Sequence, residues 1–128
     1  MTATVDTTIR YRALIVEDDP AIRKLVGKLL QRRGIDIDTA HDGKQAIEKI
    51  RRGGYAVLIL DLMVPEVNGF EIIDFVKKND IKTPVVVVSA VSHQALTKLD
   101  LDVVKLVIPK PFDVEEFTNS IIRLCCEH

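Results

Sequence analysis

The sequence is poor in the residues that stabilise very small or secreted folds. It has no tryptophan, 5% aromatic residues in all, and two cysteines that are neighbours in the chain, Cys125 and Cys126. Adjacent cysteines rarely bridge and lack the spacing of a metal motif, so we expect reduced thiols and a cytoplasmic location. With 128 residues and 47% hydrophobic content, the chain can still bury a core and form one domain.

An excess of charge and a long apolar run are also missing. Lysine and arginine number 18 against 19 acidic residues, and no apolar run reaches the roughly 18 residues of a membrane span. We therefore expect no direct nucleic-acid binding and no membrane contact. The opening MTATVDTTIR lacks the basic start and apolar stretch of a secretion signal, so we interpret 1–9 as a flexible tail before a domain at 10–128.

The sequence does contain a regular alternation of short apolar runs and helical patterns. Strands are predicted at 13–16, 35–40, 56–60, 85–88 and 103–108. Helices are predicted to follow the capping residues Asp19, Asp42, Asn68 and Asp113, with a weaker candidate over 92–99. Such alternation predicts an α/β fold with a parallel sheet, helices on both faces and right-handed crossovers.

Polar side chains follow four of the five predicted strands. They are Glu17, Asp18 and Asp19 after the first, Asp61 after the third, Ser89 after the fourth and Lys110 after the fifth. In a doubly wound sheet the carboxyl ends of the strands share one edge, where ligands bind. The sequence therefore predicts a site that combines carboxylates, a hydroxyl and an ammonium.

The residue types in this site favour phosphoryl chemistry. Carboxylates held close together raise a pKa or recruit a cation, and Mg²⁺ prefers hard oxygen ligands. A carboxylate can also attack phosphorus to form an acyl phosphate, whose charge a lysine, a hydroxyl and a metal ion stabilise. Each residue alone has an ordinary interpretation: Asp19 as a helix cap, Lys110 as a loop lysine. Their coincidence at four strand ends favours the site.

Four segments resemble the receiver domain of two-component response regulators. They are LIVEDDP (14–20), LDLMVPEVNG (60–69), VVSA (87–90) and PKPF (109–112), and the likeness covers about residues 10–126. The resemblance implies a flavodoxin-like, doubly wound, five-stranded parallel sheet of order 2-1-3-4-5. It also implies a phosphorelay function, with a sensor histidine kinase or phosphotransfer protein as donor and an unknown downstream protein as target.

The resemblance also implies a role for each site residue. Asp61 is the expected phosphoacceptor, Ser89 the switch hydroxyl and Lys110 the partner of a phosphoryl oxygen. The expected Mg²⁺ ligands are Asp18, Asp61, Glu17 and the backbone carbonyl of Met63. A cis Lys110–Pro111 bond is expected as well. Such a domain is not an enzyme on a separate substrate, because it catalyses only its own phosphorylation and dephosphorylation.

Some residues depart from the family pattern. Val107 stands where the family usually has an aromatic residue, so switching must run through backbone and aliphatic packing. Met63 and Val91 are apolar at positions that rim the family's site, which predicts slow self-dephosphorylation. No output domain follows the last predicted helix, so the chain resembles a stand-alone receiver, or a piece of a longer protein.

Three alternatives remain at this point. A pseudo-receiver would bind proteins through the same fold without phosphorylation. An aspartate-based phosphohydrolase would need an acid two residues after the nucleophile, where Met63 stands. A flavin-binding module would need a phosphate-cradling loop after the first strand, where three acids would repel phosphate.

Overall fold

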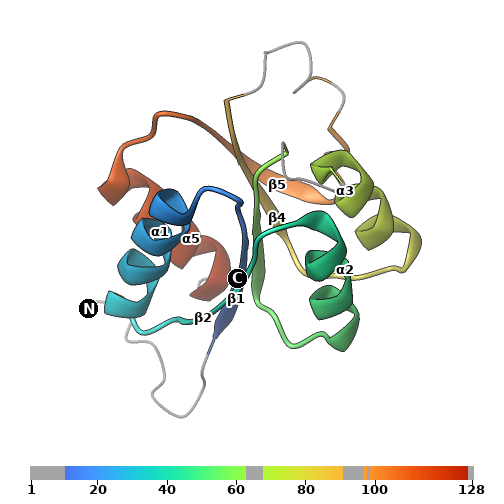
Figure 1. Cartoon of the computed structure of the whole chain (residues 1–128), viewed down its shortest axis with the longest axis horizontal. Helices are drawn as coiled ribbons and strands as arrows, with labels where there is room; N and C mark the ends of the chain where they lie inside the picture. The colour runs from blue at the N-terminus through green and yellow to red at the C-terminus, as the bar shows by residue number, and fades with distance from the viewer. Residues whose placement is uncertain (1–10, 63–67, 91–96, 98, 127–128) are drawn as a thin grey trace.

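The structure is a computed structural model that describes residues 11–62, 68–90, 97 and 99–126. The predicted tail at 1–9 lies outside the described residues, as do Met63, Val91 and most of the helix candidate over 92–99. Labels follow Figure 1, in which α4 is not used.

Five parallel strands form one sheet. They are β1 (Arg12–Val16), β2 (Asp36–Ala40), β3 (Val57–Leu60), β4 (Val85–Ser89) and β5 (Val104–Pro109). Their order is β2-β1-β3-β4-β5, and every pair is parallel. The predicted flavodoxin-like order is thereby confirmed.

Helices cover both faces of the sheet (Figure 1). The described helices are α1 (Pro20–Arg32), α2 (Gly43–Arg52), α3 (Gly69–Lys78) and α5 (Val114–Cys126). Helices α1 and α5 lie on one face, and α2 and α3 lie on the other (Figure 1). None of the helices in the described part of the chain has the length and apolar character to span a bilayer.

Short polar side chains start the helices as predicted. Asp19 accepts hydrogen bonds from the main-chain N–H groups of Ala21 and Ile22, and Asp42 accepts one from the N–H of Gln45. Asn68 and Asp113 act in the same way at α3 and α5. These side chains satisfy donors that the first turn of a helix leaves without an intrahelical partner.

Alternation along the central strands divides the core into two layers. In β3, Leu58 and Leu60 point toward α2 and α3, whereas Val57 and Ile59 point toward α1 and α5. The strand is buried along its whole length, as expected for a parallel strand with helices on both faces.

Strand β2 is half-buried on both faces, although apolar and polar residues alternate along its sequence. Its alternating sequence predicts one exposed face, but Asp36, Ile37, Asp38 and Thr39 are all half-buried. The strand is at the edge of the sheet, where α1 and α2 each cover part of it (Figure 1). Alternation therefore records the different chemistry of the two faces rather than a difference in exposure.

Candidate functional site

The strand register brings the first two groups of acids together. Val16 is opposite Leu60, so the residues that follow them, Glu17 and Asp61, leave neighbouring strands side by side. The N–H of Asp61 donates to the carbonyl oxygen of Val16 at 3.0 Å, which extends the ladder by one step. Asp61 is 8% exposed and Glu17 is 4% exposed, so both carboxylates lie at the buried end of the site.

Lys110 follows the edge strand β5 and reaches these carboxylates across the end of β4. Its Nζ lies 2.7 Å from Oε1 of Glu17 and 3.0 Å from Oδ2 of Asp61. Its N–H donates to the carbonyl oxygen of Ser89, and the Lys110–Pro111 bond is cis as expected. The Oγ of Ser89 lies 3.3 Å from Oδ1 of Asp61 and donates to it. Hydroxyl and ammonium thus contact different oxygens of one carboxylate.

The site has more negative than positive charge. Burial, followed by the nearby charge of Asp61, raises the pKa of Glu17 to about 7 despite the hydrogen bond from Lys110. Burial would lower the pKa of Lys110, but its hydrogen bonds to Glu17 and Asp61 outweigh burial and raise it. Lys110 therefore stays positively charged and donates hydrogen bonds to both carboxylates.

Three carboxylates could hold a metal ion. Oxygen atoms of Glu17, Asp18 and Asp61 all lie within 4.8 Å of one another. Hard oxygen donors in this number suit Mg²⁺, which keeps several of its waters. Asp18 is exposed, so the site opens to solvent on its side. Asp19 is a helix cap and does not belong to this group, while the expected ligand Met63 lies outside the described residues.

Two residues position the site without having been singled out in the sequence. A Cβ at Gly69 would lie 2.5 Å from the Cα of Leu62 and 3.1 Å from the carbonyl oxygen of Asp61. Only glycine allows α3 to start this close to the chain that carries Asp61. Arg23 donates from Nη1 to the carbonyl oxygen of Glu17 at 2.9 Å. Gly69 lies inside a recognised motif, but its role depends on a close approach that spacing does not show.

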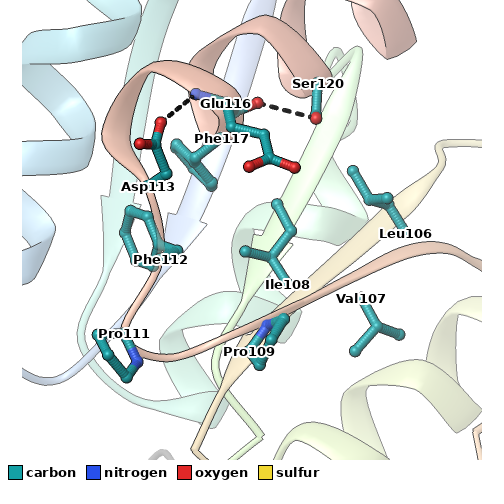
Figure 2. A pocket seen from close by; sticks show the side chains of 10 residues that line it. All are labelled: Leu106, Val107, Ile108, Pro109, Pro111, Phe112, Asp113, Glu116, Phe117 and Ser120. Atoms are coloured by element: carbon teal, nitrogen blue, oxygen red, sulfur yellow. Dashed lines mark hydrogen bonds between the residues drawn. The ribbon is translucent and has the colours of Figure 1, made fainter.

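A separate cavity of about 270 Å³ lies between β5 and α5 and contains none of the three carboxylates (Figure 2). Figure 2 shows Leu106 and Ile108 on the α5 side of β5, with Val107 on the opposite side. Val107 packs against the core beneath α2 and α3. An aliphatic side chain therefore occupies the position where the family usually has an aromatic ring.

A comparison with protein families decides the classification. The family model described as the response regulator receiver domain matches residues 13–122. The chain belongs to this family. The match includes all the residues of the receiver site described above.

Curated relatives are longer than this receiver domain. It is 34% identical over 112 residues to the response regulator ArlR of Staphylococcus saprophyticus, covering 86% of this chain and 50% of ArlR. It is 43% identical over 79 residues to the transcriptional regulatory protein TrcR of Mycobacterium tuberculosis, covering 62% of this chain and 31% of TrcR. The chain thus spans half the length of these relatives or less.

Solved receiver domains have the same fold. The receiver domain of Francisella response regulator 1452 matches with a TM-score of 0.83 and 28% identity, covering 90% of this chain and 96% of that one. The response regulator TrrA of Thermotoga maritima, solved in complex with Mg²⁺-BeF, matches with a TM-score of 0.79 and 31% identity, covering 89% and 98%.

Proposed function

We propose that this receiver domain accepts a phosphoryl group on Asp61 and transmits a signal in a phosphorelay. The observation that carries the proposal is the position of Asp61, whose two carboxylate oxygens contact Ser89 and Lys110. The donor is a phosphohistidine of a sensor histidine kinase or phosphotransfer protein. The target is a further protein whose binding depends on the phosphorylated state.

The transfer itself needs little from the protein beyond position and charge. An oxygen of Asp61 attacks phosphorus, the phosphorus–nitrogen bond of the donor breaks, and its electron pair returns to the imidazole. Lys110 is placed to pair with a phosphoryl oxygen as negative charge spreads over the group. Ser89 can turn its hydroxyl from the carboxylate to the phosphoryl group, which draws the end of β4 toward the site.

Glu17, Asp18 and Asp61 fit a Mg²⁺ ion by their donor chemistry and their spacing. When bound, the ion would neutralise phosphoryl charge beside Asp61. The related regulator TrrA was solved in complex with Mg²⁺-BeF, which supports the same metal for this chain. Three carboxylates face one ammonium, so the site has room for a second cation in its charge balance.

We also propose that the receiver has no separate substrate and that it acts in the cytoplasm. The receiver acts on its own Asp61. It loses the phosphoryl group when water hydrolyses the acyl phosphate formed there. The alternative is a pseudo-receiver that binds partners without phosphorylation. The presence of nucleophile, hydroxyl, lysine and acid pair together favours the phosphorylated form of action.

The direct test is phosphorylation by acetyl phosphate in Mg²⁺, followed by intact mass. We expect one phosphate adduct on the wild-type chain and none on Asp61→Asn, which keeps the shape of the side chain but removes the nucleophile. Asp74→Asn is the matched control, because Asp74 is an exposed acid paired with Lys78 on α3. An adduct of equal size on Asp61→Asn, or none on the wild type, contradicts the proposal.

A further inference from the structure

A groove between α1 and β2 differs from four other pockets of the described structure, each of which has acidic residues in its lining. Its volume is about 500 Å³, and its lining includes Arg23, Lys24 and Lys28 on the helix with Ile37 and Thr39 on the strand. Among the described residues, no acidic one lines it. The chain as a whole carries a formal charge of -1, so three cations in one groove are a local departure from balance.

The helix explains why the cations gather there. Between residues 20 and 35 the sequence has five basic residues and no acidic one. Positions 24 and 28 are one turn apart and share a side of the helix. The opposite side turns toward α5, where Ile22 joins the apolar core and Arg33 bonds Asn119. The groove is therefore on the β2 side of α1, away from α5.

The acidic residues of β2 lie on the face of the strand that is turned away from the groove. Alternation places Ile37 and Thr39 on the α1 side, and Asp36 and Asp38 on the α2 side. Asp38 is turned to α2, where its Oδ1 accepts from Lys49 Nζ at 2.8 Å. The floor of the groove is the apolar side chain of Ile37, which packs with the α1 layer. The groove therefore has positively charged side chains from α1 along its edge and an apolar side chain at its floor.

These lysines also differ from most others. Within the described residues, Lys49, Lys77, Lys78 and Lys82 each have a carboxylate partner, whereas no ion pair is found for Lys24 or Lys28. Both are exposed. No carboxylate of the described residues therefore has to be displaced before a ligand can pair with these two lysines.

Gly27 of α1 lets the side chain of Ile37 approach the helix closely. Gly27 lies between the two lysines, and a Cβ there would lie 2.7 Å from Cδ1 of Ile37. Glycine inside a helix costs about 0.5–1 kcal/mol relative to alanine. The close fit of Ile37 over the helix depends on this position, so the floor of the groove follows from it.

Main-chain pairing at this edge is restricted. Thr39 already donates its N–H to Asp38 Oδ1 at 2.8 Å, and its carbonyl oxygen accepts from Lys49 Nζ at 2.6 Å. A segment lying in the groove cannot use these groups to join the sheet as a sixth strand. At Thr39, recognition therefore comes from the cations and the apolar floor rather than from main-chain pairing.

We propose that the α1–β2 groove binds an acidic segment of a partner protein, in which carboxylates alternate with apolar side chains. The carboxylates would pair with Lys24, Lys28 and Arg23, and an apolar side chain would cover Ile37. A nucleic-acid backbone has no aliphatic side chain for that floor, and a membrane surface is too flat to enter a groove. Arg23 also bonds the carbonyl oxygen of Glu17, so the groove adjoins the phosphorylation site.

The length of the groove sets the probe. On α1 the lining runs from Arg23 to Gln31, or about 13 Å at 1.5 Å per residue. About four residues of an extended peptide span this length, so a six-residue peptide covers it with one residue to spare at each end. The probe is a fluorescein-labelled peptide of three Glu-Leu repeats, added to the full chain and followed by anisotropy. A peptide with Gln in place of Glu is the comparison, and a single-stranded oligonucleotide and phosphatidylserine vesicles are tested in parallel.

The variant Lys24→Glu/Lys28→Glu should weaken binding of the Glu-Leu peptide by roughly tenfold or more, because attraction becomes repulsion at both positions. Lys44→Glu/Lys82→Glu makes the same change in net charge at exposed lysines outside the groove and should leave affinity within about twofold. Thermal unfolding followed by circular dichroism checks that both variants are folded. Amide shifts at Gly27, Ile37 and Thr39 should accompany binding.

Several results overturn the proposal. They are no binding of the Glu-Leu peptide, equal binding of the Gln peptide, or equal loss in both double variants. Tighter binding of the oligonucleotide or the vesicles through Lys24 and Lys28 also overturns it, since the partner would then be of another class.

Discussion

Replacing Gly69 with alanine tests how tightly the structure holds Asp61 in place. In a helix, alanine is favoured over glycine by about 1 kcal/mol, so propensity alone predicts a more stable protein. The added Cβ, however, would lie 2.5 Å from the Cα of Leu62 and 2.8 Å from its Cδ2. A backbone atom cannot turn aside as a side-chain tip can, so the start of α3 and Leu62, two residues after the end of β3, must separate.

The size of the effect follows from these opposing contributions. Overpacking of a well-packed site costs about 1–3 kcal/mol, and the middle of this range exceeds the gain in helix propensity by about 1 kcal/mol. We expect Gly69→Ala to lower the free energy of unfolding by roughly 1 kcal/mol, seen as a lower urea midpoint at an unchanged slope. Because Leu62 follows Asp61 directly, we also expect slower phosphorylation by acetyl phosphate.

Gly27→Ala is the matched control for this substitution. Its Cβ would also be too close to a neighbour, at 2.7 Å, but that neighbour is the terminal Cδ1 of Ile37, which can rotate away. We expect a change in stability near zero and an unchanged rate of phosphorylation. If Gly69→Ala is as stable as the wild type and is phosphorylated at the same rate, position 69 does not need glycine and does not hold Asp61 in place.

Two further predictions concern ion pairs, one in the candidate site and one on the edge strand β2. Lys110→Met leaves Glu17 and Asp61 buried without their cation and should cost about 2 kcal/mol by urea unfolding without Mg²⁺, less than for a fully buried pair because the Lys110 side chain is 17% exposed; wild-type stability in this variant would contradict the assignment. Burial would raise the pKa of Asp38, but hydrogen bonds from Lys49 and Tyr55 outweigh it and lower the pKa. Asp38 thus stabilises the fold above its unfolded pKa near 4, and this contribution is lost as pH falls through the lower folded pKa. The stability difference between wild type and Asp38→Asn should therefore be largest at neutral pH and shrink below about pH 4; a difference that grows in acid would show that the pKa is not lowered.

Much of the architecture was predictable because local patterns agree with the fold. The apolar run before Asp61 could only be a buried strand once helical patterns were found on both sides of it. The caps at Asp19, Asp42 and Asn68 were predictable from residue type, since their side chains bond main-chain groups two or three positions away. Convergence of strand-end residues followed from the parallel sheet itself.

Other features depend on distances that no local pattern reports. The need for glycine at position 69 arises from the approach of α3 to Leu62, across a segment whose path the sequence does not specify. The bond from Arg23 to the carbonyl oxygen of Glu17 depends on how α1 leaves β1. The half-burial of Asp38 comes from Lys49 and Tyr55, which only the packed fold brings to it.

The most direct test of the account is to locate the phosphoryl group chemically. An acyl phosphate is reduced by borohydride, which converts the modified aspartate to homoserine and leaves ordinary carboxylates unchanged. After treatment with acetyl phosphate in Mg²⁺ and then borohydride, peptide mapping of the wild-type chain should show homoserine at Asp61 alone. Conversion at Asp18, or no conversion at Asp61 when the intact protein carries a phosphate adduct, would contradict the central claim.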